Sequence, residues 1–206
     1  MGQPCDRAVT WLPHFHDMGL VGGYLGTFYA RITSWCLPPE GFVIRPLHWL
    51  QLISAQRATI CGGPDFGYRR CLERIRDEDV EQLALSSWRV AFVGAEKIRP
   101  GTVNQFAEKF ARCGFRRNAF FPCYGLGEAT LMATGGPVGT EPVIKSISTA
   151  ALAEQQIASP RSAADVTEIT GCGQTIPGSR VAIVDRGGLV VGDEQIGEVC
   201  LAGPSV

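Results

Sequence analysis

The sequence lacks several features that would assign it to whole classes of protein. No apolar run reaches the roughly 18 residues that a membrane-spanning helix needs, so we expect no transmembrane segment. The opening stretch "MGQPCDRAV" lacks the basic-then-apolar pattern of a signal peptide. With a formal net charge of -1, the chain has no positive excess with which to attract nucleic acid or an anionic membrane. We therefore expect a cytoplasmic protein that does not bind nucleic acid.

The sequence also lacks the spacing of a disulfide framework or a clustered metal site. Its eight cysteines include no C-x-x-C pair, and most lie within apolar segments such as "ATICGG" and "GEVCLAG". Free cysteine is among the most buried residue types, so we expect these residues to fill the core in a reducing compartment. Only "HFHD" gathers histidines, and no further ligand is evident beside it. A metal-dependent hydrolase is thus a distant alternative.

Apolar strand patterns alternate with helical patterns over the first 140 residues. The expected strands lie at 8–13, 33–39, 58–64, 88–94 and 118–123. Between them lie a glycine-rich helix at 18–32, a helix at 46–56, and two segments with apolar residues at helical spacing near 64–75 and 103–110. This rhythm predicts an α/β fold with a mostly parallel sheet flanked by helices.

Beyond residue 140 the pattern changes to short strands joined by glycine and proline turns, as in "GCGQTIPGSRVAIVD" and "GEVCLAGPSV". We therefore divide the chain into an α/β subdomain at 1–140 and a β-rich continuation at 141–206. The two parts can equally form one domain.

Chemistry is expected at the carboxyl ends of the parallel strands, where three loops stand out: "PHFHDMG", "GAE" and "CYGLGEAT". The small residues Gly94 and Ala95 would let a flat ligand approach the backbone. The ring of Tyr124 offers a face for a base. The carboxylate of Glu128 can accept hydrogen bonds or hold magnesium beside phosphates.

Simpler interpretations of the same acids stay open. Because Glu128 opens an apolar run, it also fits the start of a helix, where an acid contributes roughly 0.3–1 kcal/mol through the helix dipole. Glu96 fits the same description, and Asp17 fits a helix N-cap.

Taken in order, five segments resemble the fatty acyl-AMP ligases: "WLPHFHDMGLVGG", "CGGPDFGY", "LSSWRVAFVGAEKIRP", "FFPCYGLGEATLMATGG" and "CGQTIPGSRVAIVD". These enzymes are a branch of the adenylate-forming superfamily, which also includes acyl-CoA synthetases, luciferases and peptide-synthetase adenylation domains. The resemblance covers nearly the whole chain. The combination of "HDMGL" with "SSWRVAF" and "GAE" is typical of the acyl-AMP ligase branch.

The resemblance implies a nucleotide site built from two of the loops. Gly94, Ala95 and Glu96 match the segment that lines the adenine pocket. Tyr124 and Gly125 match the pair whose ring and backbone hold the adenine and the acyl carbonyl region.

The resemblance also implies catalytic positions. Glu128 matches the acid that coordinates magnesium at the ATP phosphates, and Thr130 is a further candidate for cofactor binding. His16 matches the histidine that flanks the acyl and phosphate site, with Asp17 orienting its loop.

The implied reaction joins a fatty acid to ATP, which gives an acyl-adenylate and pyrophosphate. The acyl group then passes to an acyl carrier protein, or to a polyketide or peptide synthase, for lipid, polyketide or lipopeptide biosynthesis. The fatty chain needs an apolar channel, and the candidates for its lining are Leu20, Val21, Gly22 and Leu25.

The family's phosphate loop and its mobile C-terminal domain have no counterpart here. We therefore expect an internal fragment of the large N-terminal domain that does not catalyse adenylation alone. Two alternatives stay open: a non-catalytic nucleotide- or lipid-binding or interaction module derived from the ligase, and a fragment of an acyl-CoA synthetase.

Overall fold

The computed structural model describes residues 5–206; residues 1–4, which begin the stretch examined for a signal peptide, lie outside them. Within the described residues, a seven-stranded sheet has the order β2-β1-β3-β4-β5-β6-β9. Its strands are β1 (Arg7–Thr10), β2 (Thr33–Cys36), β3 (Ile60–Gly63), β4 (Val90–Val93), β5 (Phe120–Gly125), β6 (Met132–Gly135) and β9 (Gln174–Thr175). Neighbouring strands from β2 to β5 are parallel, whereas β6 and β9 pair antiparallel. The predicted α/β fold with a mostly parallel sheet is confirmed.

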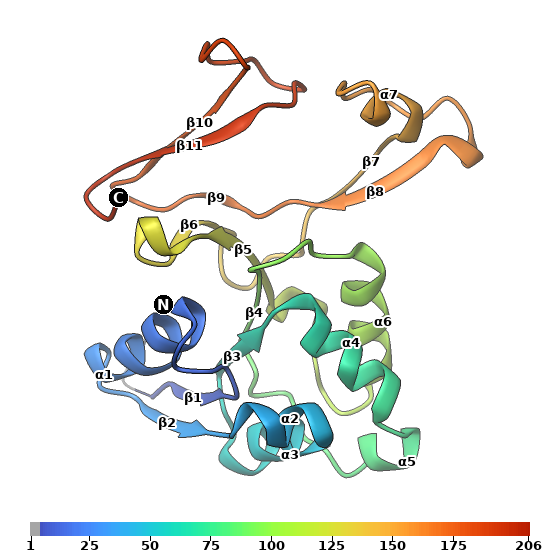
Figure 1. The fold of residues 1–206 in the computed structure, drawn as a ribbon. Helices are drawn as coiled ribbons and strands as arrows, with labels where there is room; N and C mark the ends of the chain where they lie inside the picture. The colour runs from blue at the N-terminus through green and yellow to red at the C-terminus, as the bar shows by residue number, and fades with distance from the viewer. Residues whose placement is uncertain (1–4) are drawn as a thin grey trace.

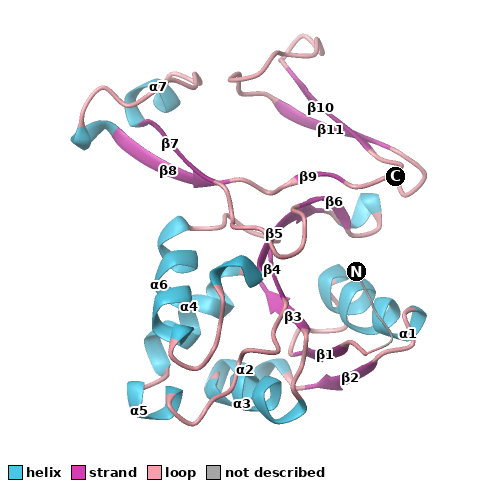
Figure 2. Cartoon of the chain, turned by 180° about the vertical axis from the view of Figure 1, so that it is seen from behind, coloured by secondary structure: helices cyan, strands magenta, loops and turns pink. Residues whose placement is uncertain are grey.

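Helices cover both sides of this sheet (Figures 1 and 2). They are η1 (Met18–Leu25, a π-helix), α1 (Gly26–Tyr29), α2 (Pro39–Ile44), α3 (Leu47–Gln56), α4 (Asp65–Arg74), α5 (Asp77–Val80) and α6 (Pro100–Ala111). Helices η1 and α1 lie on one side and α4 and α6 on the other. The sequence patterns did not reveal α2 and α5. Within residues 5–206, no helix combines the length and apolar character that a bilayer crossing requires.

An aromatic core fills the space between the sheet and helices α3, α4 and α6. Trp49, Tyr68 and Phe106 are fully buried there. The rings of Tyr68 and Phe106 meet edge to face at 5.0 Å, and Trp49 meets Trp88 in the same way at 5.2 Å. Each such pair contributes about 0.5–1.5 kcal/mol beyond its area burial. This core makes the α4 and α6 side of the sheet the rigid side.

The β-rich ending is also confirmed. Two small antiparallel sheets pair β7 (Ile144–Ser148) with β8 (Val166–Thr170), and β10 (Arg180–Val184) with β11 (Glu198–Ala202). They lie together above the main sheet, with the short helix α7 (Thr149–Ala153) beside β7 (Figure 1). Strand β9 joins the main sheet through β6, so hydrogen bonds cross the proposed boundary at residue 140. That boundary stays a prediction.

A buried carboxylate ties the segment after β4 to helix α4. Asp65 is fully buried, and its Oδ2 accepts hydrogen bonds from Arg69 Nε at 3.0 Å and from Arg99 Nη1 at 2.7 Å. Its Oδ1 accepts from the backbone N–H of Arg99 at 2.9 Å. A buried charge is tolerated only when it is paired in this way. Asp65 therefore fixes the segment 94–99, which connects β4 to α6.

The cysteines are free thiols with very different environments. Cys61, Cys71 and Cys113 are buried, as predicted for core residues, whereas the same prediction is wrong for Cys5, Cys36 and Cys200, which are exposed. Cys123 is half-buried. Its burial, as the main cause, and the nearby Cys172, as the second, raise the pKa of its thiol to about 12. The thiol lies 3.5 Å from the carbonyl oxygen of Val93.

We expect Asp65→Ala to lower the free energy of unfolding by about 1.5–3 kcal/mol, the range for hydrogen bonds to a charged group. Urea unfolding of the chain measures this change. The matched control is Asp77→Ala, because Asp77 occupies the first turn of α5 and its side chain is 75% exposed. Its ion pair with Arg112 is a surface pair worth at most about 1 kcal/mol. Equal losses for the two variants would contradict the anchoring role of Asp65.

We expect iodoacetamide to modify Cys5, Cys36 and Cys200 in the folded chain at pH 8 but to spare Cys123. A thiol with a pKa of about 12 has only about one part in 10⁴ as the reactive thiolate at that pH. Reactivity of Cys123 should rise as the pH rises toward that pKa, and in urea it should match the exposed cysteines. Peptide mass spectrometry after timed labelling measures each rate. Labelling of folded Cys123 as fast as Cys200 would contradict the expectation.

Candidate functional site

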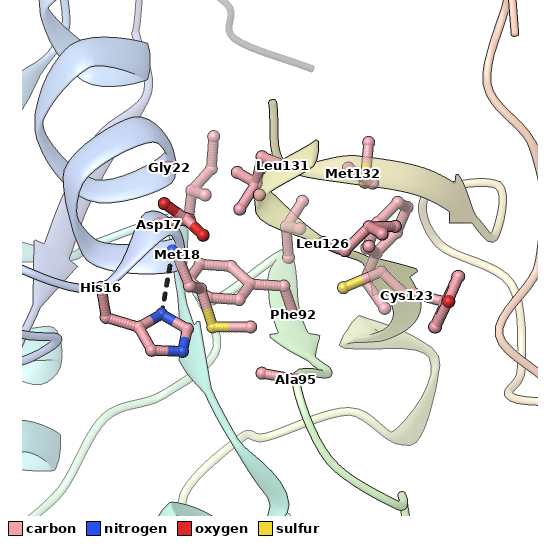
Figure 3. Close-up of a pocket in the computed structure, with 16 residues that line it drawn as sticks. His16, Asp17, Met18, Gly22, Phe92, Ala95, Cys123, Leu126, Leu131 and Met132 are labelled. Carbon is pink, nitrogen blue, oxygen red and sulfur yellow. Dashed lines mark hydrogen bonds between the residues drawn. The ribbon is translucent and has the colours of Figure 1, made fainter. Parts of the chain in front are cut away.

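A cavity of about 350 Å³ lies between helix η1 and the face of strands β3 to β5 (Figure 3). This volume is near the lower end of the about 300–1,000 Å³ that is usual for ligand pockets. The wall combines residues from η1 and its preceding loop, from the strands, and from the turn between β5 and β6. The lining residues are His16, Asp17, Met18, Gly22, Ile60, Val90, Phe92, Ala95, Phe121, Cys123, Tyr124, Gly125, Leu126, Gly127, Leu131 and Met132.

The loop before η1 holds the histidine in one tautomer. The backbone N–H of Met18 donates to His16 Nδ1 at 3.1 Å, shown by the dashed line in Figure 3. A ring nitrogen that accepts carries no proton, so in the neutral imidazole the proton sits on Nε2. The helix begins close against this loop, because a Cβ at Gly19 would lie 2.1 Å from the carbonyl oxygen of Pro13.

Asp17 occupies the N-cap position of η1 but makes no capping hydrogen bond, so the N-cap interpretation holds for its position only. Its carboxylate instead lies beside the turn after β5. A Cβ added at Gly127 would lie 2.5 Å from Asp17 Oδ2, closer than such atoms approach. The absence of a side chain at 127 thus lets the two loops meet.

The loop after β4 is compact and tied to α4. Gly94 is buried, and a Cβ there would lie 2.7 Å from the carbonyl oxygen of Cys123, so β4 and β5 end side by side. Ala95 has a left-handed φ of 65°. Glu96 Oε1 accepts from the backbone N–H of Phe66 at 2.7 Å. Glu96 therefore does lie at the start of a helix, as one interpretation of the sequence suggested. The helix is α4, which precedes Glu96 in the chain, and not one that begins at Glu96.

The alternative interpretation of Glu128 as the start of a helix is wrong. Glu128 lies in a single 3-10 turn, Gly127–Ala129, and the apolar residues that follow form strand β6. The chain doubles back so tightly that a Cβ at Gly125 would lie 1.7 Å from the carbonyl oxygen of Leu131. Met132 then pairs with Gly125 across the hairpin. Glu128 thus has no helix dipole of its own to complement.

Thr130 makes this reversal with a strained backbone. Its φ of 67° and ψ of -55° form a γ-turn, in which the N–H of Leu131 donates to the carbonyl of Ala129 at 2.8 Å. A β-branched residue rarely adopts this conformation, which costs of order 1–3 kcal/mol. The hydroxyl of Thr130 donates to the carbonyl oxygen of Ser205 at 3.2 Å. Glu128 is thereby presented, exposed, on a fixed turn.

Two further cavities adjoin the first. One, of about 420 Å³, is shared by Glu96, Tyr124, Gly125 and the segment around Cys172. The other, of about 390 Å³, extends from His16 and Glu96 toward α2. Ala95 lines all three, so the loop after β4 stands at their junction.

The structure thus brings four predicted site residues, His16, Ala95, Tyr124 and Gly125, onto one cavity. Gly94 is buried and does not line the cavity. Glu96 lines the two side cavities, and Glu128 and Thr130 lie on the rim turn between two lining residues, Gly127 and Leu131. Of the four channel candidates, Gly22 lines the cavity, whereas Leu20, Val21 and Leu25 do not.

Sequence reasoning missed the strand residues of the wall, because a continuous apolar run reads simply as core. Val90 and Phe92 line the cavity, whereas the alternate residues Ala91 and Val93 are buried on the other face. The period of two in strand side chains was the available signal. Across the described part of the chain, no group of three or more His, Cys, Asp and Glu residues gathers as a metal would need, "HFHD" included.

Comparison with known proteins identifies the family of the chain. The profile of the AMP-binding enzyme family matches residues 1–206. The chain is 39% identical over 96% of its length to the medium-chain-fatty-acid–[acyl-carrier-protein] ligase TtuA of Teredinibacter turnerae, and covers 31% of that protein. It is 40% identical over 97% of its length to the corresponding ligase JamA of Moorena producens, and covers 34% of it.

Solved structures agree. A fatty acyl-adenylate ligase from Legionella pneumophila, in complex with acyl adenylate and pyrophosphate, superposes with a TM-score of 0.92 at 37% identity, over 98% of this chain and 35% of that one. The chain thus spans about a third of the length of the relatives it matches. The predicted resemblance to fatty acyl-AMP ligases is confirmed, and the chain belongs to the AMP-binding enzyme family.

Proposed function

We propose that these residues form the acyl- and adenylate-binding part of an ATP-dependent fatty acyl-AMP ligase. One observation carries the proposal: three strand-end loops meet around an apolar cavity that has a polar rim. The loops are those of His16, of Ala95 and of Tyr124 to Glu128. An apolar cavity with a few convergent polar groups is the expected form of a site that activates the carboxylate of a fatty chain. The relatives' names point to the same substrates: fatty acids and acyl carrier protein.

The proposed roles follow from the positions of the side chains. The fatty chain lies in the cavity with its carboxylate near His16, whose Nε2–H donates to a carboxylate or phosphate oxygen. The backbone at Gly94 and Ala95, with the ring of Tyr124, holds the adenine, and Gly125 faces the acyl carbonyl region. Glu96 and Thr130 act by position, the first holding its loop to α4 and the second fixing the turn. Attack of a carboxylate on the α-phosphate requires such positioning rather than a protein nucleophile.

Glu128 fits a magnesium ion that ATP would bring. Its carboxylate is exposed and makes no hydrogen bond or ion pair with any residue in 5–206. Carboxylate oxygens are the hard ligands that magnesium prefers, usually one or two of them together with phosphates and water. A bound ion would supply charge neutralisation at the departing pyrophosphate.

The product would be consumed by transfer of the acyl group to a phosphopantetheine thiol of an acyl carrier protein, or of a polyketide or peptide synthase, in the cytoplasm. The complete protein, assayed for acyl-hydroxamate formation, tests the first step. Acceptance of the acyl group by carrier protein but not by coenzyme A supports this proposal over an acyl-CoA synthetase. No activation of any carboxylic acid would leave a binding module instead. The chain of 206 residues alone is the blank, for which we expect no appreciable rate.

We expect Glu128→Gln in the complete ligase to lower the rate of ATP–pyrophosphate exchange by about 10²–10³-fold, the usual effect of losing one electrostatic group at a reacting centre. The amide keeps the size of the side chain but removes the charge that magnesium requires. The apparent affinity for magnesium should fall with it. The matched control is Glu154→Gln, at an exposed acid just after α7, which should leave the rate unchanged. An unchanged rate for Glu128→Gln would exclude the metal-binding role.

A further inference from the structure

We infer that Asp65 and Arg99 are positioning residues for the nucleotide, because they hold Ala95 in the backbone conformation that shapes the adenine wall. This inference rests on the proposed function, in which the backbone at Gly94 and Ala95 holds the adenine. Neither Asp65 nor Arg99 lines any of the three cavities around Ala95. The two residues therefore act through the loop after β4 rather than by contact with a ligand.

Ala95 has a backbone conformation that depends on its surroundings. Its φ of 65° lies in the left-handed region, which glycine enters freely but alanine enters only at a cost. A residue stays in such a conformation only where the structure around it fixes it. Figure 3 shows Ala95 just beyond the end of the strand that carries Phe92. Because Ala95 lines all three cavities, relaxation of this one residue would change the shape of the whole site.

Reciprocal hydrogen bonds join this loop to the first turn of α4. Glu96 in the loop accepts from the backbone N–H of Phe66 at 2.7 Å, which satisfies one of the free donors at the start of the helix. In the opposite direction, Asp65 in the helix accepts from the backbone N–H of Arg99 at 2.9 Å. The guanidinium of Arg99 donates to the same carboxylate at 2.7 Å. The loop is thus held to α4 at positions 96 and 99, on the carboxyl side of Ala95.

The other side of Ala95 is fixed to the same helix. The hydroxyl of Tyr68, a fully buried residue of α4, donates to the carbonyl oxygen of Phe92 in β4 at 2.8 Å. Gly94 then lies so close to β5 that a Cβ there would be 2.7 Å from the carbonyl oxygen of Cys123. Both ends of the loop are therefore anchored to one packed unit, and Ala95 lies between the two anchors.

The burial of Asp65 makes the loop sensitive to Arg99. The side chain of Asp65 is fully buried, so its charge depends on the groups that bond it. Removal of the Arg99 guanidinium would leave this carboxylate short of a partner, and it would have to shift toward water or toward Arg69. The same carboxylate holds the backbone N–H at position 99, so its shift would release the loop and Ala95 with it.

The test uses Arg99→Gln in the complete ligase and measures KM for ATP and for the fatty acid by ATP–pyrophosphate exchange. We expect KM for ATP to rise about 10-fold, the order of one lost hydrogen bond to a charged group. We expect kcat and KM for the fatty acid to change by no more than about 2-fold, since binding of one substrate is lost and not the chemistry. Titration with a ribose-labelled fluorescent ATP analogue should show the same loss of affinity without turnover. Asp65→Asn, which keeps the size of the side chain but replaces one acceptor oxygen, should shift KM for ATP in the same direction.

A second change separates positioning from stability. Ala95→Gly removes the cost of the left-handed backbone. Combined with Arg99→Gln, it should return KM for ATP to within about 3-fold of the unchanged protein, because the two positions are coupled. If Asp65 and Arg99 only stabilised the fold, the two changes would be independent and Ala95→Gly would restore nothing.

Arg112→Gln is the matched control. The side chain of Arg112 is 43% exposed against 48% for Arg99, and it also pairs with an aspartate, but that aspartate is the exposed Asp77 of α5. Its kinetic constants should equal those of the unchanged protein. If thermal unfolding shows that Arg99→Gln does not fold, Asp65→Asn with and without Ala95→Gly makes the same comparison.

An unchanged KM for ATP in Arg99→Gln, equal rises for ATP and the fatty acid, or no recovery with Ala95→Gly would each overturn the inference while leaving the ligase activity standing. Absence of exchange with every fatty acid in the unchanged protein would instead refute the proposed function. The two failures are therefore separate results.

Discussion

Backbone-to-backbone packing at the ends of adjacent strands is the constraint on which the site depends. A Cβ at Gly62 would lie 2.0 Å from the carbonyl oxygen of Phe92, and one at Gly94 would lie 2.7 Å from that of Cys123. With Gly125 the same constraint recurs at the end of β5. A side chain at any of these points would force the neighbouring backbone to move away. The loops line one cavity because glycines let the strands that carry them approach each other closely at their ends.

The two faces of the sheet serve different purposes. On the α4 and α6 side, large aromatic residues such as Trp88 and Phe106 fill all available space. On the η1 side, Gly19 and Gly23 let the covering helix pack closely against Pro13 and Thr10, whereas Gly22 faces the cavity. The helix thus lies close to the sheet and presents no side chain to the cavity at position 22. The dense face supplies the rigidity that lets the other face stay hollow.

Much of the fold could be predicted from the sequence because it follows from local patterns of apolar residues. The alternation from 8 to 123 predicted the parallel strands, and the rule for strand carboxyl ends placed three loops at one edge. The turn at Glu128 was not readable, because "ATLM" is too short an apolar run to distinguish helix from strand. What decides it is the close contact between Gly125 and Leu131, which is tertiary. The hydrogen bond that fixes the tautomer of His16 likewise depends on how the chain turns into η1, which residue identities do not specify.

The γ-turn at Thr130 has a mechanical consequence. The hydroxyl of Thr130 is bonded to the backbone at Ser205, just beyond strand β11, so the turn is attached at one end to the β5–β6 hairpin and at the other to the β10–β11 hairpin. A relaxed turn would absorb a small movement of either hairpin by sliding within a broad conformational well. A threonine at φ 67° has few allowed conformations nearby, so its backbone has little freedom to adjust. The turn that carries Glu128 is therefore tied to the β10–β11 hairpin through a residue that can absorb little displacement.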